Sequence, residues 1–115
     1  MKKLILLLCL ISLNCRADWQ TELTLGIDGE TFVSDKIILV NAKESSLTLG
    51  RYLLKLTISK SKEDKFLEVS YALTEKTTLV AKGKDDIEDR PTNEIFAKGE
   101  KGQPNTIITL KMKPL

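Results

Sequence analysis

Residues able to do chemistry are few in this 115-residue chain, which contains no histidine at all. Histidine is the usual general base, the middle member of Ser-His-Asp and Cys-His arrangements, and the commonest zinc ligand. The two cysteines, Cys9 and Cys15, both lie near the N-terminus. We expect both to be removed with an N-terminal signal peptide, and few enzyme mechanisms remain without histidine or cysteine. We therefore expect a protein that is not an enzyme, with no catalytic residue, no metal site and no cofactor.

One catalytic spacing is formally present, the Ser-x-x-Lys pattern from Ser59 to Lys62. A lysine can act as the base for such a serine when burial neutralises it and a helical turn brings the two together. This segment instead alternates like a strand and runs into a charged turn, so we interpret it as structural. A pair of carboxylates for glycoside hydrolysis would need a cleft that nothing in the sequence places.

Four acidic residues and an arginine gather in the segment Lys82 to Asn93, where the alternation of the neighbouring segments stops. We expect this segment to be the longest loop of the domain, and binding residues often lie on loops. The glycine and closing glutamate of an EF-hand are missing, so a solvated loop is favoured over a weak cation site. The candidate partner-binding residues are Asp85, Asp86, Glu88, Asp89 and Arg90.

The N-terminus has the anatomy of a secretory signal peptide. Lys2 and Lys3 precede an apolar run that ends at Leu13 and is too short to span a membrane. We predict a signal peptide over residues 1–17 with cleavage after Ala17. The mature protein is then periplasmic or secreted, and residues 18–115 form a single domain.

A second processing route would lipidate Cys15 and make the product an outer-membrane lipoprotein. Lipoprotein signals usually have leucine three residues before the cysteine and a small residue directly before it. Ser12 and Asn14 hold those places here, so ordinary cleavage is favoured. Membrane attachment is expected only on the lipidation route.

Export also changes the charge balance. The whole chain has 18 basic and 16 acidic residues, and residues 1–17 contain three of the basic ones and none of the acidic ones. The mature domain is therefore close to neutral. Nucleic-acid binding normally needs a basic patch or stripe, so we expect no nucleic-acid partner.

Period-two alternation of apolar and polar residues dominates residues 18–115, and no sustained helical period appears there. Short strands separated by turns predict an all-β fold, and we favour a small antiparallel β-sandwich, immunoglobulin-like with about seven or eight strands, over a small barrel. Asp28-Gly29 has the sequence of a tight hairpin turn. Strands are expected within 19–27, 30–34, 37–41, 47–49, 51–60, 66–74, 79–82, 94–98 and 106–113.

Two functions fit these expectations. The first is a non-enzymatic interaction module of the bacterial envelope: an accessory protein or subunit of a larger assembly, such as a secretion apparatus, that binds another protein through exposed edge strands. The alternative is a small secreted inhibitor or binding protein for a hydrolase, with residues 82–93 as the inserting element. The identity of the protein partner is not encoded in any motif.

Overall fold

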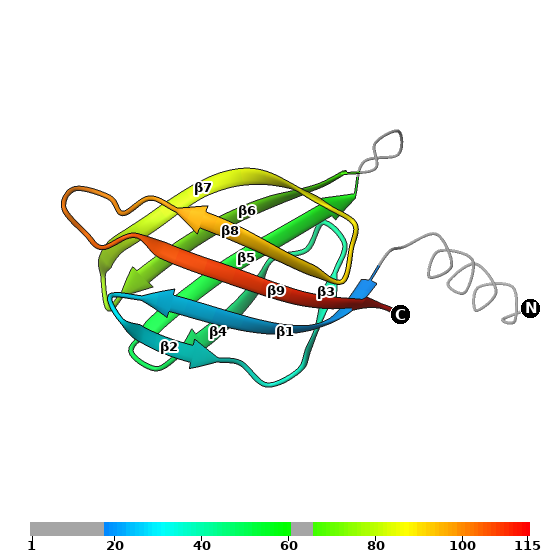
Figure 1. The fold of residues 1–115 in the computed structure, drawn as a ribbon, viewed down its shortest axis with the longest axis horizontal. Coiled ribbons are helices and arrows are strands. Elements are labelled where there is room, and N and C mark those ends of the chain that lie inside the picture. Colours follow the sequence, from blue (N-terminus) through cyan, green and yellow to red (C-terminus); the bar gives the residue numbers. More distant parts are fainter. Residues whose placement is uncertain (1–17, 61–65) are drawn as a thin grey trace, which may run out of the picture.

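The computed structural model describes residues 18–60 and 66–115, and all regular structure in these residues is β-strand (Figure 1). The predicted signal peptide, Cys15 and Lys62 lie outside the described residues. Within the described ranges, no helix is long and apolar enough to cross a membrane. The strands are β1 (Asp18–Ile27), β2 (Glu30–Val33), β3 (Ile37–Val40), β4 (Ser45–Leu49), β5 (Tyr52–Lys60), β6 (Phe66–Glu75), β7 (Thr78–Glu88), β8 (Thr92–Ala97) and β9 (Thr106–Pro114).

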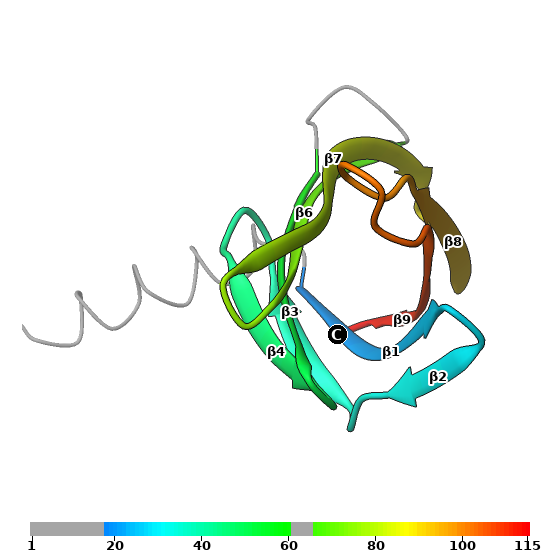
Figure 2. The ribbon, with the colours of Figure 1, turned by 90° about the vertical axis from the view of Figure 1, so that its left-hand side faces the viewer.

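These strands form two antiparallel sheets, which confirms the predicted all-β class. The β1 sheet has the order β2-β1-β9-β8, with β3 also paired to β1, and the β5 sheet has the order β4-β5-β6-β7. Seen end-on, the two sheets curve around a common interior (Figure 2). Most neighbouring strands are consecutive in the chain, whereas an immunoglobulin domain interleaves distant strands in Greek-key connections. The expected immunoglobulin-like arrangement is therefore not confirmed.

The alternation seen in the sequence corresponds to burial. In β1, β5, β6 and β9 every second side chain enters the interior while those between face solvent or are half-buried. Period-two burial is what a strand with one covered face requires. The largest fully buried side chains come from both sheets and are Trp19, Leu23, Leu25, Ile27, Leu54, Leu56, Ile58, Leu67, Leu73, Ile95, Ile108 and Leu110.

Two tight turns fix the register of the first hairpins. Asp28 and Gly29 have φ angles of 49° and 78°, as a type I′ turn requires, which confirms the predicted hairpin. Gly50 opens the β4–β5 turn with φ at 62°. Each turn has two residues, so the strands on either side are held in one register.

The segment from Ile37 to Val40 differs from expectation. A continuous apolar run such as Ile37 to Val40 is typical of a strand covered on both sides, but Ile38 is 51% exposed. The reason is position: β3 lies at the edge of the β1 sheet, paired only with the first half of β1 among the described strands. Leu39 and Ile37 face inward there, and Ile38 faces solvent.

The sheets are joined differently on their two sides. On one side, β7 turns into β8, and the Glu100 N–H donates to the Val80 carbonyl at 2.8 Å. On the other side, β2 and β3 approach β4 without a strand pairing between them. The first and last strands of the described domain, β1 and β9, pair along their whole lengths, from Trp19 opposite Pro114 to Ile27 opposite Thr106.

Candidate functional site

The prediction of a long acidic loop over residues 82–93 is wrong, because most of this segment is strand. β7 continues to Glu88 and β8 begins at Thr92, so the connection is only residues 89–91. The strand expected within 79–82 therefore continues to Glu88, and sequence reasoning missed this continuation because Gly83 and Asp85 hold inward positions and give no apolar alternation. The segment is extended because its backbone pairs with β6.

Asp85 occupies an unusual place on β7. It lies opposite Val69, whose side chain is fully buried, so its strand position belongs to the inward face, yet Asp85 itself is exposed. Its carboxylate accepts a hydrogen bond from the Asp86 N–H at 3.1 Å. Burial, and secondarily the charge of Asp85, raise the pKa of the nearby Tyr71 phenol above its ordinary value. An inward charge on an edge strand hinders pairing with another chain.

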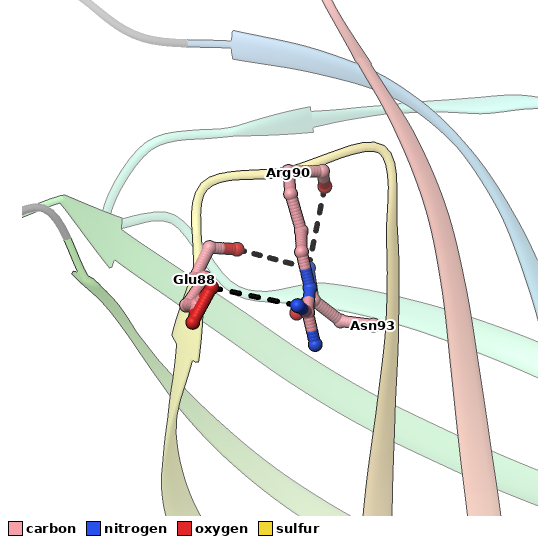
Figure 3. Close-up of polar contacts among 3 residues, drawn as sticks. All are labelled: Glu88, Arg90 and Asn93. Atoms are coloured by element: carbon pink, nitrogen blue, oxygen red, sulfur yellow. Dashed lines mark hydrogen bonds and ion pairs between the residues drawn. The ribbon is translucent and has the colours of Figure 1, made fainter.

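Glu88, Arg90 and the buried Asn93 hold the β7–β8 turn together (Figure 3). The Asn93 amide donates to the carbonyls of Glu88 at 2.9 Å and Arg90 at 3.3 Å. Arg90 returns a hydrogen bond from Nε to the Asn93 Oδ1 at 3.3 Å and pairs with the Glu88 carboxylate at 3.4 Å. These polar groups therefore stabilise the turn.

The remaining acidic candidates are separated from these. Asp89 forms an ion pair with Lys60 at 3.3 Å, and Asp86 lies opposite Glu68 on the solvent face of the β5 sheet. In the described part of the chain, no three acidic side chains come close enough to hold a metal ion. The five predicted residues thus share one edge of the molecule without forming one site.

The strongest candidate site lies on the opposite side, between the edges of the two sheets. A groove of about 530 Å³ separates β2 and the start of β3 from β4. Leu47 and Leu49 are buried in its wall, and the partly buried Phe32 and Ile37 pack against the core beside them. The lining residues are Thr31, Phe32, Val33, Ser34, Asp35, Ile37, Ser46, Leu47, Thr48, Leu49 and Gly50.

Both long walls of this groove are strand edges. The residues that close a two-residue hairpin exchange both backbone hydrogen bonds, and the residues next to them point their backbone groups away from the partner. By this alternation, Thr31 and Val33 on β2 and Ser46 and Thr48 on β4 direct their N–H and C=O groups away from β1 and β5. Among the described residues, these groups have no backbone partner. The groove therefore offers two rows of hydrogen-bonding groups.

One end of the groove is closed by a contact between the sheets. The Phe32 ring lies edge-on to Tyr52, with centroids 5.6 Å apart, and covers Gly50. The Arg51 guanidinium lies 4.8 Å from the Tyr52 ring centroid and pairs with Glu30 and with Glu75.

The ion pair of Arg51 with Glu30 has electrostatic consequences. The hydrogen bond from Arg51 holds the pKa of the Glu30 carboxyl below its ordinary value, and the same bond raises the pKa of Arg51. Both side chains are about half exposed, so the pair adds little stability by itself. Its importance is positional, because it joins the β1–β2 hairpin to the β4–β5 hairpin.

A second hollow, of about 360 Å³, lies near the β7–β8 turn and has a charged rim. Lys111 and Glu22 are cross-strand neighbours in its lining, which also includes Lys36 and Lys113. Opposite charges on neighbouring strands are ordinary for a solvated sheet face. This hollow is therefore a weaker candidate than the groove.

Comparisons with known protein families, with curated proteins and with solved structures find no match. The function must therefore be inferred from the groove. Sequence reasoning predicted exposed edge strands but missed the residues of this site. The only local signals were the short β2 and β4 segments and the glycine between β4 and β5.

Proposed function

We propose that this protein is an exported, non-enzymatic interaction module of the bacterial envelope that binds a segment of another protein in the groove between β2 and β4. The observation that carries this proposal is the pair of strand edges facing each other across a groove whose lining includes Phe32, Leu47 and Leu49. Strand addition at such edges supplies affinity through backbone hydrogen bonds and specificity through alternate side chains. An accessory subunit of a larger envelope assembly would use it in this way.

The contrast between the two sides of the β5 sheet supports this choice. β7 has the inward Asp85, the exposed Lys82 and Lys84, and a register irregularity at Leu73/Thr74. Such features discourage added strands. β4 has only Ser46 and Thr48 at its exposed positions, and its register with β5 is regular. The β4 edge is therefore the one that would accept a partner.

The hydrolase-inhibitor alternative loses the feature that suggested it. Its inserting element was the segment 82–93, which is a strand and a three-residue turn held by Asn93. Inhibition by another surface stays a hypothesis, and no feature of the described residues favours it over strand addition.

Site-directed photo-crosslinking in intact bacterial cells tests the proposal. A photoreactive residue at Thr48, on the groove, should form a discrete adduct with an envelope protein. The same residue at Thr78, exposed on the opposite edge strand of the same sheet, is the matched control. Equal adducts at both positions, or none at Thr48, would contradict a binding site in the groove.

Cell fractionation with mass analysis of the purified protein tests the envelope assignment. A soluble periplasmic species beginning at Asp18 is expected. A Cys15→Ser variant should then behave as the wild type does. Retention in the cytoplasm would contradict export, and a lipid adduct lost in that variant would establish the lipoprotein route.

A further inference from the structure

The groove differs from the rest of the surface in charge. Of the eleven described residues that line it, only Asp35 carries a charge, although charged residues make up 30% of the whole chain. A charged side chain that lay in the groove would lose part of its hydration. It would meet no opposite charge along most of the groove. Burying an unpaired charge is costly, so the walls select against charged ligands.

Resting on the proposed function, we infer that the occupant of the groove is a short, uncharged, extended segment of a partner protein. It pairs its backbone with β4 on one side and β2 on the other, and it alternates apolar with small polar side chains. Strand addition alone does not specify this side-chain chemistry.

The backbone requirement follows from the two edges. Ser46 and Thr48 direct their N–H and C=O groups into the groove from one side, and Thr31 and Val33 do so from the other. An extended strand presents matching groups on both of its edges. A helix satisfies its own backbone groups internally and would leave these edges unpaired. The groove therefore favours an extended occupant.

The side-chain requirement follows from the period of two. Residues of an added strand point alternately toward the interior and toward solvent. Toward the interior they would meet Leu47, Leu49 and the partly buried faces of Phe32 and Ile37. Toward solvent they would lie beside the hydroxyls of Ser46 and Thr48. Apolar residues suit the first set of positions and threonine or serine suits the second.

The size of the groove argues against a second copy of this chain as the occupant. A volume of about 530 Å³ is within the range of clefts that hold a small ligand. The contact of Phe32 with Gly50 closes one end. Edge strands of a folded copy belong to whole sheets, and a whole sheet does not fit between β2 and β4.

The test uses a synthetic peptide of alternating valine and threonine with both ends capped, as long as the five-residue β4. Binding is followed by titration into the purified mature protein, and amide hydrogen exchange is measured by NMR. We expect binding that is insensitive to salt, with slowed exchange of the Thr31, Val33, Ser46 and Thr48 amides. A peptide with the same side chains, N-methylated at alternate residues, should not bind.

Two variants at one position separate backbone pairing from side-chain contact. Thr48→Pro removes an N–H that points away from β5, so the β4–β5 ladder keeps its hydrogen bonds. It should lower the affinity for the peptide at least tenfold. Thr48→Val keeps the N–H and the shape of the side chain and removes only the hydroxyl, so it should lower the affinity less than Thr48→Pro does. Circular dichroism of both variants checks that the fold is retained.

Three results would overturn the inference. The first is tighter binding of a charged peptide of the same length. The second is slowed amide exchange at positions other than the four named amides. The third is slowed exchange of those four amides when the protein concentration is raised without peptide. The last would mean that a second copy occupies the edge. Crosslinking at Thr48 without peptide binding would retain the proposed function and reject the inferred chemistry of the partner segment. Failure of both would reject the proposed function itself.

Discussion

Substitution of Gly50 by alanine measures how firmly the two hairpins are held together at the closed end of the groove. Gly50 has φ at +62°, where an L-residue costs about 1–2 kcal/mol. A Cβ placed there would also collide with Cε1 of the Phe32 ring and lie 2.8 Å from its Cδ1. The ring must therefore move, which gives up its edge-on contact with Tyr52, worth about 0.5–1.5 kcal/mol.

Gly29 supplies the matched control for Gly50→Ala. Its φ is +78°, but a Cβ there would meet nothing within 4 Å. Gly29→Ala should therefore cost only the backbone contribution of about 1–2 kcal/mol, whereas Gly50→Ala should cost about 1.5–3.5 kcal/mol because the lost ring contact is added to it. For a domain of this size each kcal/mol corresponds to roughly 4–8 °C in Tm. Urea and thermal unfolding of both variants measure the difference.

A double-variant cycle tests whether the Phe32 ring is responsible. In a Phe32→Ala background the clash disappears, so the added cost of Gly50→Ala should fall to that of Gly29→Ala. The reasoning is refuted if Gly50→Ala and Gly29→Ala are equally stable in the wild-type background. It is also refuted if Phe32→Ala leaves the cost of Gly50→Ala unchanged.

Three further predictions concern single groups. Thr106→Val should stabilise the fold by about 1–2 kcal/mol in urea unfolding, because the fully buried Thr106 hydroxyl has no hydrogen-bond partner among residues 18–60 and 66–115; a loss of stability would contradict this reasoning. Asn93→Ala should cost about 1–3 kcal/mol because it removes the buried amide that donates to the Glu88 and Arg90 carbonyls, whereas Arg90→Ala at the exposed ion pair should cost less than about 1 kcal/mol; equal costs would contradict the assignment. The raised pKa of Tyr71 means that folding favours the neutral phenol. The contribution of Tyr71 to the free energy of unfolding is therefore fully present below about pH 10 and is lost as pH rises through the pKa in the folded state. Asp85→Asn should lower that pKa in a spectroscopic titration, without restoring the ordinary value because burial is the larger cause, and an unmoved titration would remove Asp85 from the explanation.

The long strands could be predicted from the sequence because one face of each is covered. Leu54 and Val69 are fully buried, and the residues beside them in the chain are partly or fully exposed. Burial of every second residue leaves its mark directly in the order of amino acids. The alternation alone therefore identifies most of the core residues that these strands contribute.

The second half of β7, from Gly83 to Glu88, could not be predicted in the same way. Gly83 and Asp85 occupy the inward positions between Ala81 and the buried Ile87, so the apolar period is interrupted there. Its extended form depends on hydrogen bonds to β6, a partner that local sequence does not identify. The charged composition suggested a loop, and the tertiary pairing overrode that preference.

The groove depends still more on the whole fold. Which edges remain unpaired is decided by β1, which takes β9 on one side and both β2 and β3 on the other. Nothing in the residues from Thr31 to Val33 or from Ser46 to Thr48 says that their outer edges will face each other. Sequence reasoning could predict edge strands in general, but not the pair that forms a site.

The pairing of β1 with β9 has a consequence for the order in which the domain can fold. β1 contributes Leu23 and Leu25 to the core, yet its long partner lies about as far away in the chain as the domain permits. In a chain that is synthesised from its N-terminus, β1 has no β9 to pair with until residues 106–114 have been made. Contacts so distant in sequence form slowly. If the protein is exported as proposed, the same delay would keep its chain unfolded while it is threaded through the membrane.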